Sequence, residues 1–500
     1  MKKKIIEIDK LLKKLKASKQ SVSLAHGVFD LFHMGHLKHL KEAKKYCSIL
    51  VVSLTRDKYV MKGPDRPYYT ESLRAEMIAN LEFVDYVTFS DTKSAVDVIK
   101  KIKPKYYIKG KDYLEHEKDA TGKIKLEVKE LIKYGGKIKY TDEITYSSSS
   151  LLKNFFDVFT EEQKKFFNKR QKQNYKNKIH TVIEKVKDLK VLCIGESIID
   201  EYIYVKSLGK TPKENLISYN YVKSETFPGG ILASALHIAN YSKKVEVISL
   251  AGNDFFQQKN KIFSNKNIKY NLIKSKKQNI KKTRFIDNDF FNKVFAFYNV
   301  NGKLINKKLE DQIIKKLNNI KSYDVVLVLD YGHGFFSKKI INYIEKNANF
   351  IALNTQTNSA NIGYNLVTKY KKANFVCIDE PEARLAISDK ESELSIVAKK
   401  IFNSFDKIEN LIITRGKNGS YAFNKKISLF TPAFSKNIID TMGAGDAFIS
   451  ITALVSCVVK DIDILSFIGN AVGSLHTNTV GNKKSVSKEE LIKFMDTLLI

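Results

Sequence analysis

A glycine-rich stretch near the C-terminus has the residue types needed for phosphoryl transfer. Asp440-Thr-Met-Gly-Ala-Gly-Asp446 places two glycines before an acidic residue, and an apolar run continues from Ala447 to Val459. This pattern is typical of a loop entering a buried helix, whose free backbone N–H groups and dipole favour an anion. We expect Asp446 to take a proton from an attacking hydroxyl, with phosphate bound by backbone N–H groups. Those backbone positions are Gly443, Ala444 and Gly445. A glycine-rich turn capped by an aspartate is the structural alternative.

A pair of histidines near the N-terminus indicates a second chemistry. His33-Met-Gly-His36 follows the predicted strand and turn of residues 21–30 and opens a predicted helix that continues to Tyr46. Two imidazoles at a helix start can bind the phosphates of a nucleoside triphosphate and stabilise charge on a leaving pyrophosphate. A metal site is the alternative, but no third ligand with suitable spacing follows. His39, on the same helix, is expected to face solvent.

The length and charge of the chain limit the classes of protein to consider. A chain of 500 residues is too long for one core, so we expect two or three domains. The net charge is +32, but lysine is spread along the whole chain and no nucleic-acid recognition module is found. We interpret the charge as a compositional bias that favours anionic small substrates, with no nucleic-acid partner. A basic nucleic-acid-binding protein is the alternative.

Hydropathy and cysteine usage indicate a cytoplasmic protein without a membrane partner. No run reaches the ~18 apolar residues of a membrane span, and the N-terminus lacks the apolar region of a signal peptide. The four cysteines are far apart, show no CxxC spacing and lie in apolar surroundings. We therefore expect buried thiols in a reducing compartment.

Residues 1–152 alternate predicted strands and helices, which indicates a doubly wound α/β domain. His26-Gly-Val-Phe-Asp30 together with the histidine pair resembles the cytidylyltransferase-like nucleotidyltransferase superfamily. The order of later landmarks resembles the adenylyltransferase half of bifunctional heptose-phosphate enzymes; these landmarks are residues 62–67, 73–76, 84–87, 103–113, 134–136 and 146–150. The resemblance implies catalytic roles for His33 and His36 in an HxGH site. It also implies contacts to the nucleotide or its phosphates from Gly27, Phe29, Asp30, Lys62, Arg74, Asp112, Ser147, Ser148 and Ser149.

Two departures from that pattern leave the nucleotide open. His26 stands where the superfamily usually has asparagine, and the serine run at 147–149 stands where Ser-Thr-Thr is common. Both changes keep polar side chains, so either ATP or CTP remains a candidate for nucleotidyl transfer.

Residues 153–189 are interpreted as a helical linker. The stretch contains no glycine or proline, and its phenylalanines fall near helical spacing. A connecting helix with a solvated basic face is therefore expected.

Residues 190–500 resemble a ribokinase-like (PfkB) sugar kinase of α/β/α architecture. Besides the stretch around Asp446, the resemblance depends on Gly195–Tyr202, Pro228-Gly-Gly230, Asp379-Glu-Pro-Glu382 and Thr414–Gly419. It implies sugar binding by Asp200, Gly229 and Gly230, and nucleotide binding by Thr414, Gly416, Gly419, Gly443, Ala444, Gly445 and Asn470. Asp379 and Glu382 would hold Mg²⁺ through water.

Arg284 lies in a predicted strand pair that could close over the sugar. It is a candidate for binding a substrate phosphate, because a planar guanidinium can donate two parallel hydrogen bonds to an oxyanion. A surface arginine on a hairpin is the alternative.

Four departures occur in the segments of the kinase half that face sugar or phosphate. Glu196 stands where aspartate is common, and Ala233 where a sugar-binding asparagine is usual. His333 replaces the lysine of Asp-Tyr-Gly-Lys-Gly, and Asn354-Thr-Gln-Thr357 replaces Asp-Pro-Lys. These changes indicate a subfamily with its own substrate.

The resemblances together imply a bifunctional sugar-activating enzyme. One half would use ATP and Mg²⁺ to phosphorylate a sugar phosphate, with heptose 7-phosphate at C1 as the expected acceptor. The other would transfer a nucleotide from ATP or CTP to a sugar 1-phosphate and release pyrophosphate. The alternatives are a kinase half that is inactive or regulatory, or one specific for a non-heptose sugar. A homodimer through the kinase domain is a further expectation.

Overall fold

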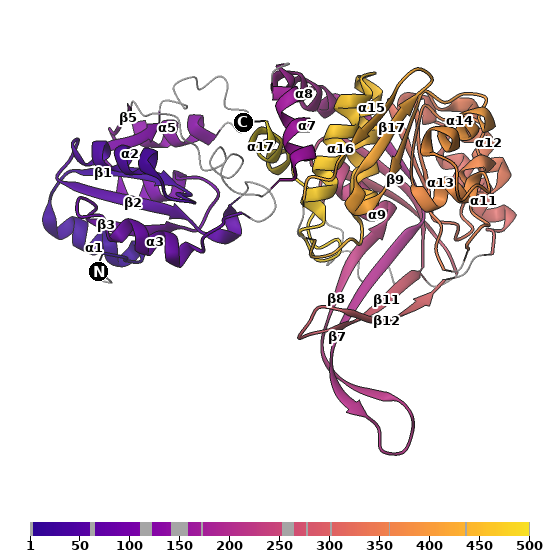
Figure 1. Ribbon diagram of the computed structural model, residues 1–500, viewed down its shortest axis with the longest axis horizontal. Coiled ribbons are helices and arrows are strands. Elements are labelled where there is room, and N and C mark those ends of the chain that lie inside the picture. Colours follow the sequence, from indigo (N-terminus) through magenta and orange to yellow (C-terminus); the bar gives the residue numbers. More distant parts are fainter. Residues whose placement is uncertain are drawn as a thin grey trace. The chain divides into compact units, whose positions relative to one another are not determined.

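The computed structural model describes residues 4–60, 66–110, 123–141, 159–171, 174–252, 265–276, 279–300, 303–359, 361–435 and 438–499. The chain divides into two compact units (Figure 1). Unit 1 comprises Met1–Gln173 and Ile492–Ile500, and unit 2 comprises Asn174–Leu491. The segment expected to be a helical linker contains α7 (Glu161–Gln171) and α8 (Tyr175–Lys185).

Unit 1 is built on a five-stranded parallel sheet in the order β3-β2-β1-β4-β5. The strands are β1 (Val22–Gly27), β2 (Ile49–Thr55), β3 (Tyr86–Ser90), β4 (Tyr106–Gly110) and β5 (Lys137–Thr141). The helices are α1 (Ile8–Ser18), α2 (Met34–Lys44), α3 (Glu71–Ala79), α4 (Val96–Ile102), α5 (Lys123–Lys133) and the short 3₁₀ helix η1 (Asp57–Tyr59). The strand order reverses between β1 and β4, and ligands of open α/β sheets bind at the carboxyl ends of the strands beside such a reversal.

Both faces of this sheet are buried. Neighbouring residues such as Leu24 and Ala25 contribute to different apolar clusters, because successive side chains of a strand point to opposite faces. The continuous apolar strands in the sequence are therefore explained by helices on both faces, as expected for a doubly wound sheet.

Unit 2 contains a nine-stranded sheet in the order β10-β9-β6-β13-β14-β15-β16-β17-β18. Its parallel strands are β6 (Lys190–Gly195), β9 (Lys244–Ala251), β10 (Ile268–Lys274), β13 (Val325–Asp330), β14 (Ile351–Thr355), β15 (Phe375–Asp379) and β16 (Asn410–Thr414). Two antiparallel strands, β17 (Ser420–Asn424) and β18 (Ser428–Thr431), complete one edge. The parallel strands place all their carboxyl ends at one side, where the predicted site residues follow.

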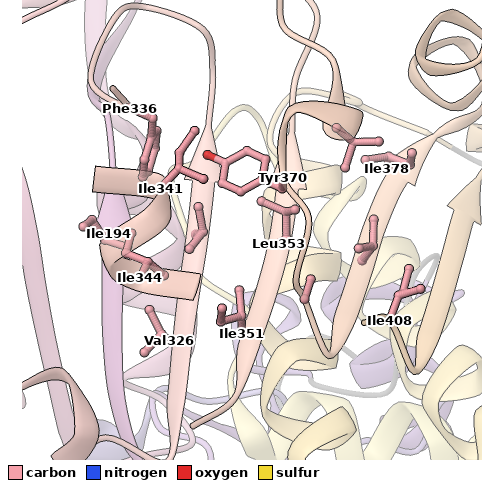
Figure 2. Close-up of a cluster of buried hydrophobic side chains, with 14 of the residues drawn as sticks. Ile194, Val326, Phe336, Ile341, Ile344, Ile351, Leu353, Tyr370, Ile378 and Ile408 are labelled. Atoms are coloured by element: carbon pink, nitrogen blue, oxygen red, sulfur yellow. The ribbon is translucent and has the colours of Figure 1, made fainter. Parts of the chain in front are cut away.

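Helices cover both faces of the nine-stranded sheet (Figure 1). The group that includes α9 (Ile231–Ile238), α15 (Ala444–Val458) and α16 (Ile462–His476) packs together, with α15 in contact with both neighbours. The other group is α11 (Lys307–Lys316), α12 (Lys338–Asn347), α13 (Glu380–Ala386) and α14 (Leu394–Ser404). The remaining helices are α17 (Lys488–Leu498) and the 3₁₀ helices η4 (Val186–Asp188), η5 (Ile320–Ser322), η6 (Val367–Lys369) and η7 (Gly416–Asn418). Figure 2 shows part of the core, in which Val326, Ile351 and Leu353 of the sheet are buried with Ile341 and Ile344 of α12.

A separate four-stranded sheet, in the order β12-β11-β7-β8, belongs to the same unit. Its strands are β7 (Ser197–Lys210), β8 (Ile217–Gly230), β11 (Ile280–Asp287) and β12 (Lys293–Asn299). The β7–β8 hairpin is buried where it leaves the nine-stranded sheet and exposed toward its tip, which projects away from the helices (Figure 1). The expectation of a strand pair around residues 282–285 is met by β11 and β12.

The described residues include no helix that is both long and apolar enough to cross a bilayer. Cys47, Cys193 and Cys377 are buried free thiols, whereas Cys457 is half-buried.

The packing of α15 against α16 generates a stability prediction. A Cβ added at Gly469 would overlap the buried ring of Phe448, whereas one at Gly473 would meet the same ring at an ordinary 3.7 Å. Gly469→Ala should therefore destabilise the chain by about 1–3 kcal/mol through overpacking. Gly473→Ala, one turn away, should leave stability unchanged or raise it by about 0.5–1 kcal/mol, because alanine favours helix. Thermal unfolding of both ligand-free variants tests this, and equal midpoints would contradict it.

Candidate functional site

The loop before α15 has the geometry expected of an anion-binding turn. Gly443 is the N-cap of α15 and has a φ of +79°, a left-handed conformation that favours glycine. A Cβ at this position would also overlap the side chains of Asn482 and His476. At Gly445, by contrast, a Cβ would meet nothing within 4 Å, so this part of the helix start borders open space. Glycine at position 443 is therefore required by the turn and by its protein neighbours, while the helix start at Gly445 leaves room beside the backbone.

Asp446, in the first turn of α15, is the carboxylate beside this loop. It is only 8% exposed, and its Oδ1 accepts hydrogen bonds from the Tyr331 hydroxyl (2.8 Å) and from Nε2 of Gln356 (2.9 Å). Burial raises the pKa of Asp446 to about 6, and the charge of Asp200 adds to this, while Tyr331, Lys282 and Gln356 oppose it. A base with a pKa just below neutrality is ionised at physiological pH and still accepts a proton readily.

A cavity of about 300 Å³ adjoins the helix start and unites most of the residues expected to bind nucleotide. Its lining includes Thr414, Gly416, Gly419, Ala444, Gly445 and Asn470. Asn470 is held in place because its Nδ2 donates to Ser420 Oγ (2.7 Å) and to the Ser466 carbonyl (2.8 Å). The fold therefore brings together segments more than fifty residues apart around one nucleotide-sized space.

The residues expected to bind sugar also lie together. Arg284 Nη1 is 2.6 Å from Asp200 Oδ1, and a Cβ on Gly229 would overlap the other oxygen of Asp200. Gly230 has a φ of +59° and is the N-cap of α9. The guanidinium of Arg284 is thus already paired with the carboxylate of Asp200.

Three further residues at this site were not expected to belong to it. Tyr331 and Gln356 contact Asp446, and Lys282 is a buried ammonium whose pKa is lowered by burial and raised by the charge of Asp200. Asp446 also acts on Lys282 electrostatically. Lys282 stands two positions before Arg284 on β11, so the alternation of a strand was the signal that could have found it.

Asp379 and Glu382 form a capping box at the start of α13. Asp379 Oδ1 accepts from the Glu382 N–H (2.8 Å), and Glu382 Oε2 accepts from the Asp379 N–H (3.0 Å). Glu382 Oε1 accepts a further bond from the Thr357 N–H (2.9 Å), and burial together with the charge of Asp379 raises the pKa of Glu382. The described residues contain no cluster of three His, Cys, Asp or Glu side chains that could hold a metal ion. Both Glu382 oxygens therefore bind backbone N–H groups, and of this pair only Asp379 lines the nucleotide cavity.

In unit 1 the two catalytic candidates lie together at the start of α2. His33 is the N-cap, and its Nδ1 accepts from the Gly35 N–H (3.1 Å). The rings of His33 and His36 are stacked with centroids 3.9 Å apart, and Phe29 packs edge-on against His36 at 5.3 Å. Gly27 ends β1 close to the ring of Phe29, so the turn and both imidazoles follow the carboxyl end of this strand.

Asp30 and Arg74 have positions that differ from those expected for phosphate contacts. Asp30 is fully buried, accepts from the backbone N–H groups of Tyr68 and Tyr69, and lies 2.7 Å from Nε of Arg66. Its carboxylate therefore holds the chain at residues 66–69 instead of facing a ligand.

The guanidinium of Arg74 is likewise fully buried. It donates to the carbonyls of Val28, Thr55 and Tyr69 and to the carboxylate of Asp57. The role expected of Arg74 in phosphate binding is therefore corrected to a structural one, since its donors bind strand ends and turns of the protein.

The exposure expected for His39 was wrong. Its Nδ1 lies 2.8 Å from Thr141 Oγ1, and the ring is buried because α2 packs against β5. The remaining expected residues of this unit, Lys62, Asp112, Ser147, Ser148 and Ser149, lie outside the described residues.

Each of the two α/β units thus has a parallel sheet, with the expected site residues near the carboxyl ends of its strands. Residues 188–489 match the pfkB family of carbohydrate kinases, and residues 24–155 match the cytidylyltransferase-like family. The chain belongs to the pfkB family and carries an N-terminal cytidylyltransferase-like domain. It is an enzyme with a kinase half and a nucleotidyltransferase half.

Curated relatives carry both kinds of domain in the reverse order. The chain is 36% identical over 308 residues to the bifunctional protein HldE of Nitratiruptor, which covers 60% of this chain and 64% of the relative. It is 42% identical over 112 residues to HldE of Campylobacter fetus, covering 22% of this chain and 24% of that one. The chain thus spans only about a quarter of the length of the first curated relatives it matches.

A solved structure shares the fold of the kinase half. Phosphofructokinase-2 of Escherichia coli aligns with a TM-score of 0.53 at 14% identity, over 62% of this chain and 99% of that chain. This likeness establishes the ribokinase-like fold of unit 2.

The buried carboxylate of Asp440 connects the anion-binding loop with the four-stranded sheet. Asp440 is 3% exposed and accepts from the N–H groups of Met442 (3.1 Å) and Gly481 (2.9 Å). It also accepts from the Tyr202 hydroxyl on β7 (2.6 Å) and from Lys293 Nζ on β12 (2.8 Å). Lys293 therefore supplies the cationic partner of a carboxylate that holds the loop.

Lys293→Met is expected to lower kinase turnover about tenfold or more, because a charge-assisted hydrogen bond to a buried carboxylate is lost. Lys281→Met is the matched control. Lys281 lies on the same sheet and also forms a 2.8 Å ion pair, but with Glu201, and its side chain is 41% exposed compared with 39% for that of Lys293. ADP release with a sugar-phosphate acceptor measures the kinase half, because the other half would release pyrophosphate. Equal effects of both substitutions would contradict this role of Asp440.

Proposed function

We propose that the chain activates a sugar in two reactions, phosphorylation of a sugar phosphate by ATP and nucleotidyl transfer to the resulting sugar 1-phosphate. The observation that carries the first reaction is the position of Asp446. It is a buried carboxylate with a pKa raised to about 6. It follows Gly445, which lines the nucleotide-sized cavity, and it is close enough to Asp200, the partner of Arg284, for the two charges to interact.

In the kinase half, Asp446 accepts the proton of the attacking sugar hydroxyl. The backbone N–H groups at Gly443–Gly445 stabilise the charge of the transferring phosphoryl group, and the ammonium of Lys282 adds to this stabilisation. Asp200 and the backbone of Gly229 and Gly230 orient the sugar. Mg²⁺, held through water by Asp379 and Glu382, would neutralise the phosphates of ATP.

In the nucleotidyltransferase half, His33 and His36 stabilise the charge that develops when pyrophosphate leaves. Their place at the start of α2 favours this role, because the helix N-terminus attracts phosphate. The nucleotide is ATP or CTP.

Heptose 7-phosphate, phosphorylated at C1, is the acceptor that we propose. Support comes from the resemblance of both halves to heptose-phosphate enzymes and from the net charge of +32, which favours an anionic sugar.

A second candidate is a kinase half that acts on another sugar or is regulatory. Ala233, His333 and Asn354 favour it, because they depart from the family pattern on segments that face the site.

Phosphorus NMR of the full chain with Mg²⁺, ATP, CTP and heptose 7-phosphate, and then with heptose 1-phosphate, tests the proposal. A heptose bisphosphate from the first substrate and a nucleotide sugar from the second are expected, and the product identifies the base. A nucleotide sugar without any bisphosphate would instead support the second candidate.

Two substitutions should separate the reactions within one chain, each being the control of the other. Asp446→Asn removes the base and should abolish phosphorylation while nucleotidyl transfer continues. His36→Ala should lower nucleotide-sugar formation by ~10²-fold or more, the effect of losing one preorganised donor, while phosphorylation continues. Near-normal phosphorylation by Asp446→Asn, or a loss below about threefold in His36→Ala, would reject the corresponding assignment.

The exposed end of the β7–β8 hairpin supports assembly as a homodimer. Leu208, Leu216, Ile217 and Tyr221 are all exposed there, and a two-stranded ribbon without a partner is marginally stable. Ile217→Asp should therefore convert a dimer into a monomer in light-scattering measurements. Ser207→Asp, which adds the same charge to the hairpin without removing apolar surface, should leave the dimer intact. A native chain that is monomeric at all concentrations would contradict the proposal.

A further inference from the structure

Both hydrogen bonds to Asp446 from other side chains reach the same oxygen. The Tyr331 hydroxyl and Gln356 Nε2 donate to Oδ1, whereas Oδ2 receives no hydrogen bond from the part of the chain that the structure describes. Because a carboxylate held through one oxygen cannot rotate freely, the other oxygen is presented in a fixed direction.

The two donors are themselves held firmly. The backbone of Gln356 donates to the Asp330 carbonyl (2.8 Å), and its own carbonyl accepts from Asn365 Nδ2 (3.1 Å). The Tyr331 N–H donates to Glu196 (3.0 Å), and the Tyr331 carbonyl accepts from Asn358 and Asn361. Donors anchored through their backbones can orient a third group with little loss of further side-chain freedom.

The charge around Asp446 is set by a small number of groups. Asp200 on β7 and Lys282 on β11 act on it with opposite signs, and Arg284 on β11 is paired with Asp200. Glu196, after β6, is a further carboxylate nearby and accepts from the Tyr331 N–H. Gln356, after β14, adds a donor but no charge, and it stands in the segment where the family pattern has lysine.

We propose that Tyr331 and Gln356 are positioning residues, which bind Oδ1 of Asp446 so that Oδ2 accepts the substrate proton. Because the side chain at position 356 is a neutral amide, Asp446 stays a stronger base than it would be beside a cation. The proposal rests on the proposed role of Asp446 as the base. As the sugar oxygen bonds to the γ-phosphorus, its O–H bond breaks and the proton moves to Oδ2. The bond from the γ-phosphorus to the bridging oxygen breaks, and ADP leaves with that electron pair.

Charged residues at position 356 should shift the pKa of Asp446 by a measurable amount. A lysine placed here would be an opposite charge within hydrogen-bond reach, which typically lowers a carboxyl pKa by about 1–3 units. A glutamate at position 356 would raise the pKa of Asp446, because two carboxylates at this distance cannot both ionise easily. Gln356→Met keeps the approximate size of the side chain but removes the donor, so it isolates the loss of orientation.

The first experiment follows Asp446 without any substrate. In full-length protein labelled with [4-¹³C]aspartate, the Asp446 carboxyl resonance is assigned by its absence in Asp446→Asn. Its titration midpoint should fall by about one unit or more in Gln356→Lys and rise in Gln356→Glu. Tyr364→Lys is the control, since it adds the same charge to the same loop at a side chain that is 91% exposed. It should leave the midpoint unchanged.

The second experiment measures turnover of ATP and heptose 7-phosphate against pH. The acid limb of kcat/KM should move in the same direction as the carbon titration in the lysine and glutamate variants. Gln356→Met and Tyr331→Phe should lower kcat with little change in the KM for the sugar, which a general loss of folding would not produce.

The two experiments separate failure of the inference from failure of the proposed function. Unchanged midpoints in both charge variants would overturn the inference, whether or not the enzyme turns over heptose 7-phosphate. Shifted midpoints without any turnover of this sugar would leave the orientation of Asp446 supported and would reject the proposed substrate. Unaltered kcat in both Gln356→Met and Tyr331→Phe would overturn the positioning role.

Discussion

The kinase site depends on a buried carboxylate that binds a turn of backbone. Glu196 follows β6 and is almost fully buried, and it accepts from the N–H groups of Tyr331 and His333 at 3.0 Å each and from that of Phe335. Burial, with help from the charge of Asp330, raises the pKa of Glu196 to about 7. Backbone N–H groups that would otherwise be unsatisfied in the interior therefore have an acceptor, and the turn after β13 has one conformation. Tyr331, whose hydroxyl binds Asp446, belongs to this turn.

Other carboxylates of unit 2 bind backbone N–H groups in a similar way. Asp330 accepts from the Gly332 N–H and the Tyr370 hydroxyl, Asp440 from the N–H groups of Met442 and Gly481, and Glu382 from those of Asp379 and Thr357. Each of these carboxylates holds a connecting segment of the chain in place. The site is consequently preorganised by buried acids that bind the protein, while the chemistry is proposed for Asp446, the acid beside the ligand cavity.

The nucleotidyltransferase half uses its charged residues in a similar way. Asp30 and Arg74 are buried and bind backbone groups of the turns that surround β1 and β2. Their residue types suggested ligand contacts, but an arginine whose donors reach three carbonyls and a carboxylate stabilises the loops instead. His33 and His36, at the start of α2, are the residues of this half for which phosphate binding is proposed.

Local sequence predicted both folds and the order of the two halves. Alternating strands and helices indicated the first fold, and a family resemblance of short glycine-rich and acidic motifs implied the second. It also predicted site roles for Asp446, the histidine pair and the residues around Thr414 and Asn470, each of which lies in a short motif. It did not identify Tyr331, Gln356, Lys282 or Lys293 as parts of the site, nor the structural use of Asp30 and Arg74. Those roles follow from contacts between distant segments, such as that of Lys293 with Asp440, which is 147 residues away. Whether a charged side chain binds a ligand or the protein depends on which donors and acceptors the tertiary structure places beside it, and no local pattern contains that information.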